Sequence, residues 1–183
     1  MLNRNAYRSV GGVALATAFI LLIPLLAAPA WTLFDFVIAG VFIFGTGLTY
    51  VLVASKAGNI AYRAAVGVAL AAAFLLVWIN LAVGIIGNSG DPANTMYLGV
   101  LAVGIVGAIF ARLRPHEMAR ALFATALAQG LVAVIALVFG LGSGSPPGVL
   151  GILILNGFFV GLFVGSAWLF REAARRGPER GAV

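Results

Sequence analysis

Six long apolar stretches, separated by short polar turns, constrain this chain more than any other feature of its sequence. The stretches are residues 10–28, 33–55, 61–87, 94–113, 118–141 and 148–170. Each is near or above the roughly 18 residues that a helix needs to cross the hydrocarbon of a bilayer. Because lipid offers no hydrogen bonds to the backbone, stretches of this kind are predicted to be helices. The sequence therefore predicts an all-α integral membrane six-helix bundle, with residues 1–183 as a single transmembrane domain.

Composition leads to the same class of protein. Only 9% of the residues are charged and 63% are hydrophobic, whereas a soluble domain carries about 25% charged residues. The alternating polar and apolar pattern of a transmembrane β-barrel is absent. The chain contains no cysteine, which excludes disulfides and thiolate metal sites.

The basic residues all fall on one side of the predicted membrane. They are Arg4, Arg8, Lys56, Arg63, Arg112, Arg114, Arg120, Arg171, Arg175, Arg176 and Arg180. The turns on the opposite side carry Asp35 and Asp91 and no Lys or Arg. The positive-inside rule then predicts that both termini are cytoplasmic. Since this topology explains the net charge of +6, we expect membrane lipids as partners and no nucleic acid.

An internal repeat relates the first and third spans. The segment 6–19, AYRSVGGVALATAF, recurs as 61–74, AYRAAVGVALAAAF. The fifth span keeps a weaker trace, in which Arg120 is followed by Ala-Leu-Ala at 126–128. Self-similarity at a fixed offset is typical of a repeated structural unit, so the sequence predicts three parallel two-helix hairpins. The alternative is chance matching, because Ala, Leu, Val and Gly dominate the composition.

Glycines recur at the spacing that helix contacts in membranes use. Gly157, Gly161 and Gly165 form two successive G-x-x-x-G steps on one face of the last span. The fourth span has small residues at the same spacing, beginning at Gly104 and Gly107. Small residues let two backbones approach closely in lipid. The face of the last span is therefore a candidate helix-packing face, used either within the bundle, which we favour, or between copies of the chain.

A few polar side chains lie within or beside the apolar spans. The candidates for a polar pocket open to the outside are Asp35, Asn80, Asp91, Gln129 and Asn156. Polar residues in a membrane are costly and are therefore functional hypotheses. The competing interpretation is structural, since Asn and Gln commonly hydrogen-bond between helices. Asp35 and Asp91 stand where carboxylates stabilise a helix start.

Several chemistries are excluded by the residues themselves. The one histidine, His116, stands in a turn among arginines rather than within a span, which disfavours intramembrane haem. No metal-ligand cluster, nucleophile–base pair or nucleotide-binding motif is present. The sequence thus predicts no catalytic residues, no cofactor-binding or metal site, and no bound cofactor.

The block W-I-N-L-A-V-G-I-I-G at 78–87, followed by P-A-N at 92–94, resembles a family of small bacterial polytopic inner-membrane proteins of unknown function. The resemblance extends through 99–104 and 118–121. It implies a bacterial inner membrane and says nothing about a substrate. It also draws attention to Asn80 and to the turn 88–94.

Three functions remain open on these observations. The preferred one is a non-catalytic helical bundle that serves as an accessory or scaffold component beside another membrane protein, or beside itself as an oligomer. The alternative is a small-solute or ion transporter lined by the polar candidates. An enzyme acting on a lipid or quinone is the least favoured, because no catalytic constellation is visible.

Overall fold

The computed structural model describes residues 4–27, 31–55 and 59–176, and within them every regular element is a helix. The helices are α1 Arg4–Ala27, α2 Leu33–Ala54, α3 Ile60–Ala82, the 3₁₀ helix η1 Pro92–Thr95, α4 Met96–Ala111, α5 Pro115–Val138 and α6 Gly148–Arg176. Six spans, one of which joins η1 to α4, are long and apolar enough to cross a membrane. The predicted all-α, multi-pass membrane fold is therefore confirmed.

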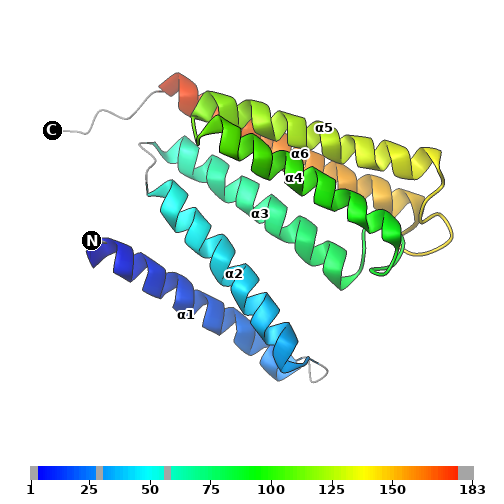
Figure 1. The fold of residues 1–183 in the computed structure, drawn as a ribbon, viewed down its shortest axis with the longest axis horizontal. Coiled ribbons are helices and arrows are strands. Elements are labelled where there is room, and N and C mark those ends of the chain that lie inside the picture. Colours follow the sequence, from blue (N-terminus) through cyan, green and yellow to red (C-terminus); the bar gives the residue numbers. More distant parts are fainter. Residues whose placement is uncertain (1–3, 28–30, 56–58, 177–183) are drawn as a thin grey trace. The chain divides into compact units, whose positions relative to one another are not determined.

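The chain divides into two compact units where the sequence predicts one domain. The first, Met1–Lys56, contains α1 and α2, which pack along each other. The second, Ala57–Val183, contains α3 to α6. Figure 1 traces the helices of each unit by colour along the chain.

The second unit is a four-helix bundle in which α5 and α6 form the central pair. α6 also packs along α3, and α5 also packs along α4. The core of this bundle is apolar and aromatic, and Leu76, Ile152, Phe159 and Phe170 are fully buried. By contrast, α3 and α4 touch at few positions. The predicted pairing of successive helices into hairpins holds for α1 with α2 and for α5 with α6, but the second hairpin is not a packed pair. The threefold repeat is not confirmed.

One end of the bundle is closed by hydrogen bonds between distant residues. This end contains the start of α3, the end of α4, the start of α5 and the end of α6, and we call it the basic end because Arg63, Arg112, Arg114, Arg120 and Arg171 lie there. The Tyr62 hydroxyl donates to the Leu113 carbonyl at 2.8 Å. The Asn59 side chain caps α3 and donates to the Ala173 carbonyl at 3.2 Å. These bonds fix three helix ends relative to one another.

The third span is shorter than its apolar sequence predicts, since α3 ends at Ala82 rather than at Gly87. Gly84 has a φ of +81°, a left-handed conformation that ends a helix and favours glycine. Its amide and that of Val83 both donate to the Ile79 carbonyl, at 3.1 and 3.0 Å. The apolar residues that follow are buried in a turn rather than in a continued helix, and Ile85 and Ile86 are fully buried.

Candidate functional site

Three buried polar side chains from three helices meet inside the bundle. Gln129 of α5 donates from Nε2 to Oδ1 of Asn156 on α6 at 2.8 Å. The Tyr97 hydroxyl of α4 lies 3.2 Å from the same oxygen and 3.1 Å from the Asn156 Nδ2. All three residues are at most 1% exposed. We call this set the amide cluster. The structure thus brings together two of the predicted pocket residues, Gln129 and Asn156.

The hydrogen bonds of the amide cluster also fix the orientation of its amides. Asn156 Nδ2 donates to the Ile152 carbonyl at 2.8 Å, so Oδ1 of Asn156 is the acceptor that faces Gln129. Gln129 must therefore present Nε2 to it. This leaves Oε1 of Gln129 buried and without a hydrogen-bond partner among the described residues. A buried acceptor left unpaired costs about 1–3 kcal/mol.

Asn80, the third predicted pocket amide, makes a separate contact. Its Nδ2 donates to the Asn94 carbonyl at 3.2 Å, and its Oδ1 is buried without a partner within the described part of the chain. The side chain of Asn94 holds the turn that follows α3. It accepts from the amides of Ile85 and Ile86 at 3.1 and 2.9 Å, and donates to the carbonyls of Ile86 and Asn88. Asn94 is therefore the central residue of the turn.

The turn after α3 also meets the turn between α5 and α6. A Cβ added at Gly142, whose φ is +68°, would lie 2.6 Å from the Gly87 amide nitrogen. No side chain fits there, so glycine is required for this close approach. The two turns form the end of the bundle opposite the basic end.

The two predicted pocket carboxylates stand at helix starts. Asp35 forms a capping box with Thr32, whose amide donates to the Asp35 carboxylate at 2.7 Å. Asp91 caps η1 by accepting from the Ala93 amide at 2.9 Å. In both cases the carboxylate satisfies a backbone donor that a helix start leaves free. Neither residue contributes to the amide cluster.

The glycine face of α6, which consists of Gly157, Gly161 and Gly165, does not pack within the four-helix bundle. A Cβ added at any of the three would meet no atom within 4 Å. Within the described part of the second unit this face therefore makes no helix contact, and its packing within the six-helix bundle stays a prediction. The reason lies on the opposite face of the helix, where bulky side chains make the contacts with α3 and α5. Those buried residues are Ile152, Asn156, Phe159, Phe163, Ser166, Ala167, Phe170 and Ala173.

The glycines of α4 do make a helix contact. A Cβ at Gly107 would lie 2.8 Å from the Ala121 Cβ of α5, and one at Gly104 would lie 3.3 Å from the Thr125 hydroxyl. The small-residue pattern thus marks a close contact on α4 and an open face on α6.

Sequence reasoning missed Tyr97, and it pointed to Asn94 only as part of the turn 88–94, without its role in holding that turn. Tyr97 resembles an ordinary aromatic residue near a membrane interface, where its hydroxyl could reach water, so nothing in the sequence marks it as a partner of Asn156. Asn94 stands beside Asp91 and Pro92 in an evident helix start, but its bonds to Ile85 and Ile86 require the folded turn.

Among the described residues, no three His, Cys, Asp or Glu side chains lie together in a way that would hold a metal ion. Comparisons of the chain with protein-family models, with curated proteins and with solved structures find no match.

Proposed function

We propose that the chain is a non-catalytic membrane protein that serves as an accessory or scaffold component and binds a helix of another membrane protein. We also propose that it lies in a bacterial inner membrane with both termini in the cytoplasm. The one-sided distribution of its basic residues supports this orientation. The resemblance of the 78–94 block to small bacterial inner-membrane proteins supports the location.

The observation that carries the proposal is the bonding of the buried amides to one another. Gln129 and Asn156 hydrogen-bond across α5 and α6, and Tyr97 adds α4. Side chains paired in this way hold helices together, and each such bond in a membrane contributes about 0.6–2 kcal/mol. The polar interior is thus used for stability, which favours a structural role over a hydrated pathway.

The glycine face of α6 provides the surface that a partner helix would use. Gly157 and Gly161 are exposed, and the large apolar side chains of Ile154 and Phe158 stand exposed beside them. Two glycines one turn apart carry no side chain and leave the backbone of α6 uncovered there. In lipid, glycines at this spacing let a second backbone approach and gain van der Waals contact.

The proposal is tested by native mass spectrometry of the protein extracted gently from its own membrane. We expect a stoichiometric complex with a second membrane protein. A lone protomer that retains a small molecule would contradict the accessory function and favour a binding pocket. A symmetric oligomer of this chain alone would show that the partner helix belongs to a second copy.

A matched pair of variants locates the contact. Gly161→Leu places a bulky side chain on the glycine face of α6, and we expect it to abolish the complex. Gly99→Leu is the control, because Gly99 is an exposed glycine of α4 that also has no atom within 4 Å of an added Cβ. Loss of the complex in both variants would contradict a specific role for the α6 face.

A second function, transport of a small polar solute or ion, is favoured by one observation. Oε1 of Gln129 and Oδ1 of Asn80 are buried acceptors without partners among the described residues. A water molecule or a solute that donates to either oxygen would remove the cost of leaving it unpaired. Flux measurements in proteoliposomes test this function. If the chain is a transporter, Gln129→Leu should abolish flux. If the unmodified protein gives no flux of neutral polar solutes or of alkali cations, transport of these two classes of solute is excluded.

A further inference from the structure

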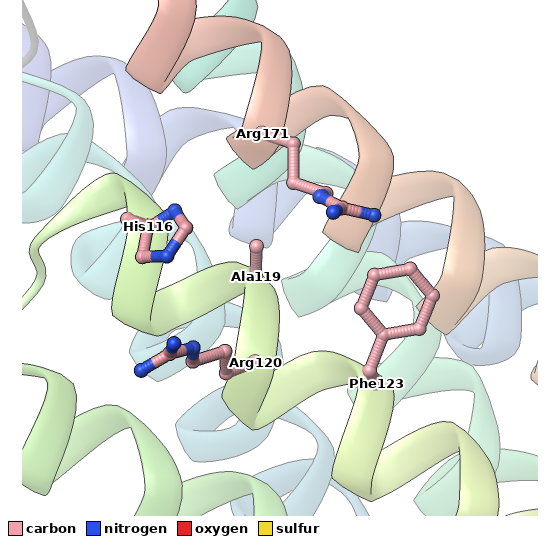
Figure 2. A pocket seen from close by; sticks show the side chains of 5 residues that line it. All are labelled: His116, Ala119, Arg120, Phe123 and Arg171. Carbon is pink, nitrogen blue, oxygen red and sulfur yellow. The ribbon is translucent and has the colours of Figure 1, made fainter.

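A cavity at the basic end of the bundle is lined by basic and aromatic side chains. Its volume is about 210 Å³, and it is lined by His116, Ala119, Arg120, Phe123 and Arg171. Figure 2 shows the first four along one stretch of α5 and Arg171 reaching across from α6. We propose that this cavity binds the phosphate group of an anionic membrane lipid.

The position of the cavity fits the depth of a lipid headgroup. α5 carries no charged residue after Arg120, and α6 carries none before Arg171. These two arginines are therefore the innermost charges of their helices, at the boundary between the apolar spans and water. Phosphate groups of lipids lie at this boundary, where positively charged residues bind them most favourably.

The charges around the cavity are only partly neutralised. Glu117 lies 3.4 Å from Arg120, but both side chains are largely exposed, at 45% and 70%, so this pair is weak. Glu172 bonds to Arg176 at 2.8 Å and lies 4.0 Å from Arg175. Arg171 forms no ion pair with the carboxylates in the described part of the chain. Its charge is available to an anion.

Arg171 is also held in place by an aromatic side chain. Its guanidinium carbon lies 5.7 Å from the centre of the Phe123 ring, within the range of a cation–π contact. A guanidinium whose carbon lies over an aromatic ring still has N–H groups that can form two parallel hydrogen bonds to phosphate oxygens. Phe123 itself offers an apolar surface to the glycerol and upper acyl chain of the lipid.

The positive-inside rule accounts for basic residues at this end, but not for this arrangement. A basic residue that only sets the orientation of the protein in the membrane does not need to lie beside a cavity or against an aromatic ring. Arg175 shows the contrast, since it lies one turn further along the same helix, is 75% exposed and is near Glu172. Arg171 and Arg175 can therefore be compared as test and control positions.

The test uses the full chain in nanodiscs of zwitterionic phosphatidylcholine that contain increasing fractions of phosphatidylglycerol, with bound lipid counted by native mass spectrometry. We expect Arg171→Gln to lower the affinity for phosphatidylglycerol about tenfold, because two charge-assisted hydrogen bonds are lost. Arg175→Gln should change it less than twofold. Helical content is checked by circular dichroism, and since Arg171 is exposed we expect no change.

Two outcomes would overturn the proposal. If Arg171→Gln and Arg175→Gln weaken lipid binding equally, or not at all, the lipid responds to diffuse surface charge and not to the cavity. If millimolar inorganic phosphate displaces phosphatidylglycerol from the unmodified protein completely, the cavity takes soluble phosphate rather than a lipid. Binding that depends on Arg171 and survives inorganic phosphate supports the lipid site. This test is independent of the proposed partner helix, because neither variant touches the glycine face.

Discussion

The glycines of α4 and those of α6 share a sequence pattern but have opposite surroundings. Gly107 lies so close to α5 that an added Cβ would stand 2.8 Å from that of Ala121, while Gly161 has open space. The difference arises from the other residues of each helix. α6 carries Asn156 and three buried phenylalanines on the face opposite its glycines, and these make its contacts in the bundle. Small-residue spacing therefore predicts that two backbones can approach, but not which helix supplies the second one.

The largest effect should follow from filling the α4 contact. Gly107→Leu forces a side chain against Ala121, and overpacking of this kind costs about 1–3 kcal/mol. We expect the free energy of unfolding, measured by denaturant titration in detergent micelles, to fall by about 3 kcal/mol. The matched variant Gly161→Leu should change it by less than about 0.5 kcal/mol, as surface substitutions do. Equal losses in the two variants would show that the glycines of α4 and α6 do not differ in their packing.

The next effect tests the face of α6 that does pack. Asn156→Leu removes the acceptor of Gln129 and both contacts to Tyr97. Buried donors are then left unpaired, so we expect the free energy of unfolding to fall by about 2 kcal/mol. The same titration measures it. A loss no greater than that of Gly161→Leu would show that the two faces of α6 do not differ in their contribution to stability.

A smaller effect should follow from Gln129→Leu. This change removes one hydrogen bond but also removes the unpaired Oε1, and the two contributions oppose each other. We expect a loss of about 1 kcal/mol or less, in the range of interhelical bonds in membranes. The double variant with Asn156→Leu should lose less than the sum of the single losses, because both changes act on one bond. Additive losses would mean that the two amides do not interact in the membrane.

Hydropathy and turn residues predict the six helices because lipid leaves the backbone no alternative. The end of α3 was missed for a physical reason. The residues after Ala82 are as apolar as those before it, and the helix stops because Gly84 takes a left-handed conformation while Asn94 binds the amides of Ile85 and Ile86. Bonds between residues eight or nine positions apart in an irregular turn leave no periodic trace in a sequence.

The candidate site was predictable in part. Because placing an amide side chain inside a membrane is energetically costly, the sequence alone indicates that Gln129 and Asn156 are important. That they bond to each other depends on the packing of α5 against α6, and Tyr97 joins them only because α4 packs along α5. In the same way, the sequence shows Arg120 and Arg171 as charges at the membrane boundary, but that both line one cavity depends on helix packing.

The central claim, that the glycine face of α6 binds a partner helix, is tested most directly by photo-crosslinking in native membranes. A benzoyl-phenylalanine would replace Phe158, which stands beside the glycines and is 47% exposed, and in a control it would replace Leu127 of α5, which is 76% exposed. We expect a discrete protein adduct from position 158 that disappears when Gly161→Leu is added, and none from position 127. Adducts of equal yield from both positions, or none from position 158, would contradict the claim.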